Sequence, residues 1–561
     1  MKSINKGKQS IGKVVNNGSR GQMMKKRNIK AYIPLILIEL YLAISYLLYR
    51  YGCYMWPFRD DQRTLIFMLL MQCMFGCGYI LAVRCDKLQI NSGTGSLVSV
   101  QKVMFLCCII SSIIFIPMCK SYTNSWYPPL IRMLLDPQGV YYGLAEVALN
   151  RTGIRIWGLL DVFPYMLLPL TIYKWDALKK KVKIWSIFLV VGYLLIYLSS
   201  GRNISVAVQM MSVVAVWLSV AFRETEAENH RKILKRTTVI CVAYILLVVS
   251  FFGFTMSSRI EFSEEVAQNL DEIVLADKNE AQGVAEQVDE IGQISGTEEA
   301  GEIEEVNEIG EIGETEQTGK KENVDAFAES VVNWDAEKMG QSLGTGIYEY
   351  NGLEITEAQI TEFNKVYAVF PNYTDIWSKA YVNTADIIVR NLPASLKNIY
   401  VIGSCYITNG YNCLTVALHS EHKWTYGIGH STFLSSYFDL FFHTNISERT
   451  YYSRLTNEQV YPLVSKSLWP STFVQWADDL TFVGVIFFMG VMGSVIARTW
   501  LSIIKRDSYW GVLLLGQFVL WTLFLPANNI LENSGGFFIT FWTVFIMWLI
   551  TEIKVRKEAK A

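Results

Sequence analysis

Three short stretches between residues 406 and 484 decide how this chain must fold. Residues 406–411 read Tyr-Ile-Thr-Asn-Gly-Tyr, residues 426–433 read Tyr-Gly-Ile-Gly-His-Ser-Thr-Phe, and residues 478–484 read Asp-Asp-Leu-Thr-Phe-Val-Gly. Glycines, hydroxyl groups and ionisable side chains are unfavourable in hydrocarbon unless they face other protein or a water-filled cavity. We therefore expect these stretches to line a cavity whose walls are made by the rest of the chain.

The composition around these stretches is that of an integral membrane protein. The 561 residues are 51% hydrophobic and only 18% charged, which lies outside the range of soluble domains. We predict an all-α polytopic bundle of about 12 transmembrane helices, because the chain contains ten strong apolar runs and two weaker ones, each near the ~20 residues needed to cross a bilayer. The strong runs are 31–49, 64–83, 103–119, 156–173, 184–198, 204–222, 237–256, 480–497, 509–525 and 535–551, and the weaker pair is 399–418 and 424–442.

Charge predicts the orientation of these spans. Residues 1–30 hold nine Lys and Arg and no apolar run, so we expect a basic cytoplasmic tail. Most basic residues of the short connections fall on the same side as this tail, which places both termini in the cytoplasm. Helices 1–7 then occupy residues 31–256, helices 8–12 occupy residues 399–552, and residues 553–561 form a short cytoplasmic tail.

Three long connections are predicted to lie outside the cell, residues 120–155, 257–398 and 443–472. Between residues 260 and 330 the chain holds 22 Asp and Glu against three Lys and few aromatic residues. We therefore predict that residues 257–332 are a disordered acidic insert. The aromatic-rich residues 333–398 are predicted to form a structured external lid.

Composition also limits the ligands. The basic charge outside the insert is dispersed over loops, which favours a lipid bilayer or an anionic lipid-linked substrate as partner and disfavours nucleic acid. Most cysteines lie in apolar runs, no Gly-rich nucleotide loop is visible, and the outer loops lack an Asp-x-Asp signature. We expect no cofactor and no metal.

A family resemblance follows from these motifs. The connection Ser-Ser-Gly-Arg-Asn at 199–203, the large external loop and the three stretches above resemble the oligosaccharide repeat-unit polymerases, which make O-antigen and capsular polysaccharide. The resemblance implies a lipid-sugar glycosyltransferase (GT-C-like) fold in a bacterial plasma membrane. It also implies an enzyme that joins polyprenyl-pyrophosphate-linked oligosaccharides on the outer leaflet, with a flippase and a chain-length regulator as expected partners. The acidic insert is not part of the family pattern.

Such an enzyme must hold a pyrophosphate, for which the planar, permanently charged guanidinium of arginine is suited. Arg202 follows a glycine in a tight external connection, and the resemblance also points to this position. The other arginines that we expect at the outer face are Arg259, Arg390, Arg449 and Arg454.

The enzyme must also remove a proton from the acceptor hydroxyl. His430 is the leading candidate because histidine changes charge near neutral pH. If residues 424–442 cross the bilayer, however, His430 lies nearer the inner face, and it can equally be a structural histidine. Asp478 and Asp479 are alternative bases or helix caps. Tyr406 and Asn409, one helical turn apart, are candidate sugar ligands or contacts between helices.

Two other functions fit the same pattern. A secondary transporter or lipid-oligosaccharide flippase would use intramembrane carboxylates without covalent chemistry. A ligase would transfer the finished glycan to a different acceptor. The sequence favours the polymerase, because it contains no convincing internal repeat and has an external loop of more than a hundred residues.

Overall fold

The chain divides into two compact units, which are described separately: Met1–Met256 with Val382–Ala561, and Ser257–Tyr381. In this computed structural model the described residues are 29–54, 56, 58–86, 99–136, 140, 159–200, 203–223, 230–255, 347–350, 353–356, 386–457 and 470–558.

The described part of the second unit is one antiparallel hairpin. Its strands are β1 (Ile347–Tyr350) and β2 (Leu353–Thr356), with Ile347 opposite Thr356. This hairpin belongs to the predicted lid and adds two strands to a chain expected to be all-α. The predicted acidic insert at residues 257–332 lies outside the described residues.

The first unit is helical and confirms a polytopic membrane protein. Eight helices in the described part of the chain are long and apolar enough to cross a membrane. They are α2 (Ile33–Tyr51), α3 (Gln62–Cys85), α4 (Val100–Thr123), α9 (Lys180–Ser199), α10 (Asn203–Phe222), the helix His230–Thr255, α19 (Thr472–Arg506) and α21 (Gly535–Glu558). Two apolar helices are shorter, α8 (Val162–Tyr173) and α20 (Tyr509–Phe524). The remaining elements are α5 (Leu130–Leu135), η1 (Trp175–Ala177), α14 (Ile387–Asn391), α15 (Ala394–Leu418), α16 (Thr432–Phe442), α17 (Ile446–Arg449) and α18 (Tyr451–Asn457).

Side-chain caps fix where several of these helices begin. Asp61 accepts a hydrogen bond from the Thr64 backbone N–H before α3, and Ser471 does the same for α19. Ser431 and Ser508 cap α16 and α20. Each cap satisfies a backbone donor that has no partner within its own helix.

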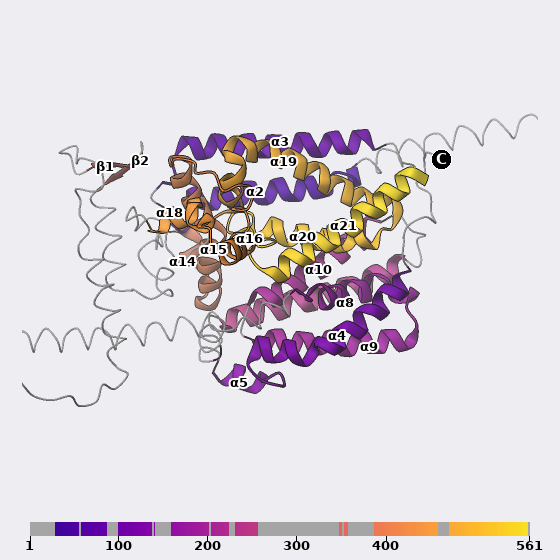
Figure 1. Cartoon of the computed structure of the whole chain (residues 1–561). Helices are drawn as coiled ribbons and strands as arrows, with labels where there is room; N and C mark the ends of the chain where they lie inside the picture. Colours follow the sequence, from indigo (N-terminus) through magenta and orange to yellow (C-terminus); the bar gives the residue numbers. More distant parts are fainter. Residues whose placement is uncertain are drawn as a thin grey trace, which may run out of the picture. The chain divides into compact units, whose positions relative to one another are not determined.

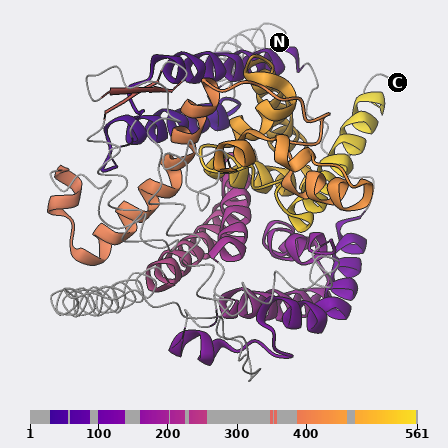
Figure 2. The same cartoon turned by 60° about the vertical axis from the view of Figure 1, so that its left-hand side comes forward.

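The closest helix pair joins the two ends of the sequence. Helices α3 and α19 run side by side, and both views show the N-terminal helices next to the C-terminal ones (Figures 1 and 2). Glycines allow this approach: a Cβ atom added to Gly78 would lie 1.9 Å from the carbonyl oxygen of Gly490, and one added to Gly493 would lie 2.3 Å from that of Phe75. Small residues let helix backbones meet closely in membranes.

Substitution of Gly78 by Ala should therefore lower stability. The added methyl group has to push two backbones apart, which typically costs about 1–3 kcal/mol. We expect a lower thermal unfolding midpoint for Gly78→Ala in detergent. Gly76→Ala is the matched control, because its Cβ would meet only the Glu39 side chain, at 3.6 Å. Equal midpoints for the two variants would contradict this packing.

Helix α15 corresponds to the predicted span 399–418 but contacts only one end of its neighbours. Trp56 donates a hydrogen bond to Thr408 Oγ1 at 2.9 Å, and His419, which follows α15, contacts Asp61 at 3.1 Å. Trp56 and Asp61 both belong to the connection between α2 and α3. Figure 1 correspondingly shows α14, α15, α16 and α18 gathered at one end of the long helices.

The prediction of a full span at residues 424–442 is wrong. Only Thr432–Phe442 is helical, and the chain before it forms a loop in which Tyr426 and Gly427 have positive φ values of 59° and 78°. A glycine adopts this left-handed conformation without penalty, but a tyrosine rarely does. The weaker pair of segments therefore does not form two crossings, and His430 lies at the same end of the helices as the start of α19.

Helix α19 is broken near its beginning. Thr481 has φ 60° and ψ 164°, which is not helical, so a short first segment carrying Asp478 and Asp479 is separated from the long second segment. Such a conformation is unusual for a β-branched residue and is often found next to functional sites.

Candidate active site

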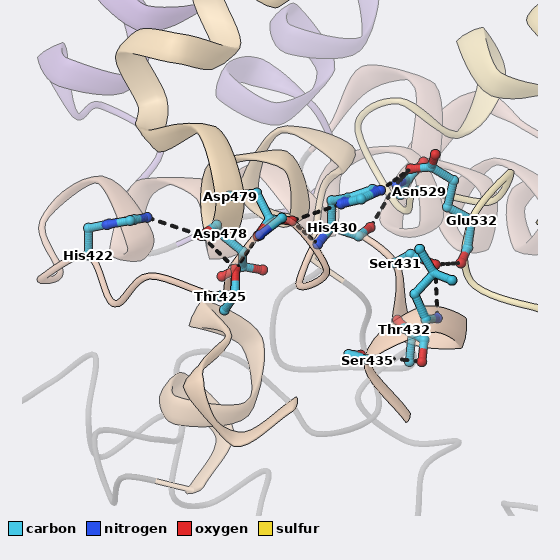
Figure 3. A network of polar contacts seen from close by, with 12 residues as sticks. His422, Thr425, His430, Ser431, Thr432, Ser435, Asp478, Asp479, Asn529 and Glu532 are labelled. Atoms are coloured by element: carbon cyan, nitrogen blue, oxygen red, sulfur yellow. Dashed lines mark hydrogen bonds and ion pairs between the residues drawn. The ribbon is translucent and has the colours of Figure 1, made fainter. Parts of the chain in front are cut away.

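The carboxylate of Asp479 organises the loop that follows α15. It lies two residues before the break at Thr481, and its exposed side-chain fraction is 6%. Asp479 Oδ1 accepts hydrogen bonds from the Thr425 hydroxyl and the Gly427 N–H, and Oδ2 accepts from the His430 N–H at 2.8 Å (Figure 3). The residue therefore holds the glycine-bearing loop in place.

His430 is held by the same carboxylate. Its Nδ1 lies 2.8 Å from Asp479 Oδ2. An ionised carboxylate only accepts hydrogen bonds, so Nδ1 carries the proton and Nε2 is left as the basic atom of the neutral ring. The His430 carbonyl oxygen accepts from Asn529 Nδ2 at 3.0 Å, which fixes the backbone on the other side. His430 and Asp479 form what we call the His–Asp dyad.

A second carboxylate faces the dyad. Glu532 Oε2 lies 3.8 Å from His430 Nε2 and accepts a hydrogen bond from Asn529 Nδ2 at 2.7 Å (Figure 3). Burial lowers the pKa of His430, but the hydrogen bond to Asp479 and the charges of Glu532 and Asp479 outweigh burial, so the pKa lies above its ordinary value.

This arrangement predicts a pH effect of Glu532→Gln. A base works only when unprotonated, so a raised pKa of His430 moves the acid limb of the rate profile to higher pH. Without the Glu532 charge the pKa of His430 falls, and the acid limb of the variant should move to lower pH than in the parent. The measurement is kcat/KM of the parent and of Glu532→Gln over a series of pH values, from which the position of each acid limb is read. An unmoved limb, or one moved to higher pH, would exclude His430 as the titrating base.

Asp478 forms hydrogen bonds with two neighbouring connections. Its side chain is buried, and Oδ1 accepts the backbone N–H of Tyr451 at 2.7 Å, the first residue of α18. Its carbonyl oxygen accepts a hydrogen bond from His422 Nε2 and lies 2.7 Å from Thr425 Oγ1, whose single hydrogen it shares with Asp479 Oδ1. Of the two aspartates predicted as alternative bases or helix caps, Asp478 accepts the Tyr451 N–H at the start of α18 and Asp479 accepts hydrogen bonds from His430, and a role of either as the base stays a prediction.

None of the described arginine candidates, Arg390, Arg449 and Arg454, has a hydrogen bond or ion pair to the dyad among the described contacts. Arg390 is exposed on the short helix α14. Arg454 is 9% exposed, and its guanidinium donates to the carbonyl oxygens of Arg449 at 3.1 Å and Glu421 at 2.7 Å. Arg454 also lies over the Tyr451 ring, which makes it a residue that joins two connections and not a free phosphate ligand.

The two leading arginine candidates, Arg202 and Arg259, lie outside the described residues. Residues on either side of Arg202 are described, however, and Tyr197, Ile204 and Ser205 line a cavity in the helical unit. The pyrophosphate role of both arginines stays a prediction.

This cavity has a volume of about 660 Å³. Both predicted sugar ligands, Tyr406 and Asn409, line it, and Asn409 is 6% exposed. Thr432 and Phe433, which follow the dyad histidine closely in the chain, form another part of the wall. Further aromatic rings at the wall are Tyr122, Tyr165, Tyr197, Tyr437, Phe524 and Phe537.

Polar contacts tie the wall of the cavity to the dyad. Thr432 Oγ1 and Gln475 Nε2 both donate to Asn533 Oδ1, each at 3.2 Å. Ser431 Oγ donates to the Glu532 carbonyl oxygen at 2.6 Å (Figure 3). Residues 526–534, between α20 and α21, thus contact His430 of the dyad and also contribute side chains to the cavity wall.

Sequence reasoning missed this loop. Its Asn529 and Glu532 contact His430 of the dyad, and its Asn528 and Asn533 line the cavity. The available signal was the density of amide and carboxylate side chains in a connection of only nine residues between two apolar runs. Among the described residues, no group of three or more His, Cys, Asp or Glu side chains is placed to hold a metal ion.

No family model, no curated protein and no solved structure matches the chain. The function must be argued from the site itself.

Proposed function

We propose that this protein is a membrane glycosyltransferase that joins polyprenyl-pyrophosphate-linked oligosaccharides into a polysaccharide. The observation that carries the proposal is the His–Asp dyad, which hydrogen bonds of Ser431, Thr432 and Asn529 connect to the wall of an aromatic-lined cavity. A carboxylate that accepts from Nδ1 fixes one tautomer of the imidazole and stabilises the imidazolium formed when Nε2 takes a proton. This is the arrangement that deprotonation of a hydroxyl group requires.

The transfer step uses these atoms as follows. The hydroxyl oxygen of the acceptor sugar forms a bond to the anomeric carbon of the donor chain, while the bond from that carbon to the pyrophosphate oxygen breaks. The hydroxyl proton passes to His430 Nε2, and the polyprenyl pyrophosphate leaves with the bonding electrons. Asp479 stays ionised throughout and balances the charge that appears on the imidazole ring.

The cavity has the character of a glycan site. Sugars present apolar faces that pack on aromatic rings and hydroxyl groups that bond to amides and carboxylates, and the wall offers both kinds of partner. Exclusion of water by such a wall protects the donor from hydrolysis, since water competes with the acceptor hydroxyl.

The pyrophosphate is assigned to Arg202, as the family resemblance suggests, and to Arg259, because of its place just beyond the seventh predicted span. Guanidinium groups would neutralise the charge that develops as the carrier leaves. Described residues on both sides of Arg202 line the cavity, which supports its assignment.

The experiment is a reconstituted reaction. Purified protein in lipid nanodiscs is given a synthetic polyprenyl-pyrophosphate oligosaccharide, and products are identified by mass spectrometry. We expect lipid-linked chains that grow by whole repeat units, with one polyprenyl pyrophosphate released for each unit joined. Unchanged substrate that is only moved across the bilayer of a matched vesicle would show a flippase and overturn the proposal.

A further inference from the structure

The cavity contains polar atoms whose partners are missing from the described protein. Asp161 Oδ1, Gln209 Oε1, Asn409 Oδ1 and Gln517 Oε1 are buried and accept no hydrogen bond from any described residue. All four residues line the cavity, and Gln209, Asn409 and Gln517 are 8%, 6% and 1% exposed. Buried polar atoms are normally satisfied, so this set of acceptors fits a ligand that brings several donors.

The charge of the wall narrows the chemistry of that ligand. Asp161 is the one ionisable acid among the described lining residues, and no described Lys, Arg or His lines the cavity. Tyr122 donates to Asp161 Oδ2 at 2.8 Å, which leaves Oδ1 without a partner. A buried carboxylate is stable in its ionised form when a cation is supplied.

Tyrosine rings line the same cavity as this carboxylate. Tyr122 and Tyr197 meet edge to face with ring centroids 5.8 Å apart, and Tyr165 contributes a third ring to the lining. The faces of such rings attract ammonium groups through their quadrupole. Carboxylate and rings together favour a positively charged amine over a neutral hydroxyl group.

We propose that the cavity selects a sugar bearing a free, protonated amine, with Asp161 as the residue that determines this specificity. The assignment to a sugar rests on the proposed function, whereas the preference for an amine rests on the cavity alone. The ammonium group of the sugar binds Asp161 Oδ1 near the tyrosine rings. Hydroxyl groups of the sugar donate hydrogen bonds to Gln209, Asn409 and Gln517.

Two matched probes test the preference. Tetramers of glucosamine and of N-acetylglucosamine have the same backbone, but only the first carries free amines. Binding of each to the full protein in nanodiscs is measured by calorimetry, at a pH where the amine is protonated. We expect the glucosamine tetramer to bind at least about tenfold more tightly, as a desolvated charged contact should allow.

Asp161→Asn should abolish this preference, because the amide keeps an acceptor for Tyr122 but loses the charge. Glu39→Gln is the control, since Glu39 does not line the cavity, and it should keep the parental preference. Correct folding is checked by gel filtration and by unfolding midpoint. Tyr122→Phe is a second variant that leaves the carboxylate and the ring and should also keep the preference.

Failure of this inference can be separated from failure of the proposed function. Equal binding of the two tetramers by the parent, absence of binding, or a preference kept in Asp161→Asn would each overturn the amine specificity. None of these results concerns glycosyl transfer, which the reconstituted reaction tests. A parent that prefers the amine tetramer but joins no lipid-linked units would overturn the transferase alone.

Discussion

Replacing His430 with Asn should lower the rate of glycosyl transfer by about 10²–10⁴-fold, the contribution expected of a general base. The Asn side-chain amide can take the place of Nδ1–H and donate to Asp479, so the loop should stay folded. What is lost is Nε2, the atom that we assign as proton acceptor. The measurement is the rate of chain extension under single-turnover conditions with saturating lipid-linked substrate.

His422→Gln is the matched control for this variant. His422 Nε2 donates to the Asp478 carbonyl oxygen at 3.1 Å, and the Gln amide can make the same bond without an imidazole. We expect transfer within about twofold of the parent, as for surface substitutions away from a site. If His430→Asn kept the parental rate, the proton would have to leave by another route.

Replacing Asp479 with Asn should reduce transfer by a factor on the order of 10³, because the amide no longer specifies the productive tautomer of His430. The effect has a structural part as well. Asp479 accepts from Thr425, Gly427 and His430, and an amide turns its NH₂ toward one pair of these donors. We expect stability to fall by about 1–3 kcal/mol, which a thermal melt measures separately from rate.

The variant Asp478→Asn distinguishes the role of Asp478 from that of Asp479. The Asn side-chain oxygen can still accept the Tyr451 N–H, so this variant should transfer at nearly the parental rate. Thr425→Val removes one donor to Asp479 but leaves His430. Its rate of transfer should lie between the rates of Asp478→Asn and Asp479→Asn. A larger loss of rate in Asp478→Asn than in Asp479→Asn would reverse the roles assigned to these residues.

The helical spans were predictable because hydrophobic length alone determines them. Eight long apolar helices appear where strong runs were expected. The segment 424–442 was misread because its apolar content is similar to that of a span, whereas its loop is stabilised by bonds to Asp479, a residue far away in the sequence. A window of local hydropathy contains no information about such a partner.

The site was predictable in its residues but not in its pairings. His430, Asp479, Tyr406 and Asn409 were all singled out, and the structure brings the first pair into contact and the second pair to one cavity. Glu532 could not be predicted as a site residue, because a carboxylate in a short connection is usually only a solvent-exposed charge. Its proximity to His430 depends on how α20 and α21 pack against α16 and α19, which no local pattern encodes.

The strongest test is a comparison of four transfer rates: the parent, His430→Asn, Asp479→Asn and the variant with both substitutions. If His430 and Asp479 act as one unit, the doubly substituted protein should be no slower than the slower single variant, because the second change removes nothing that still functions. Rate losses that multiply in the double variant would show that the two residues act independently, and the dyad would then not be the catalytic unit of this protein.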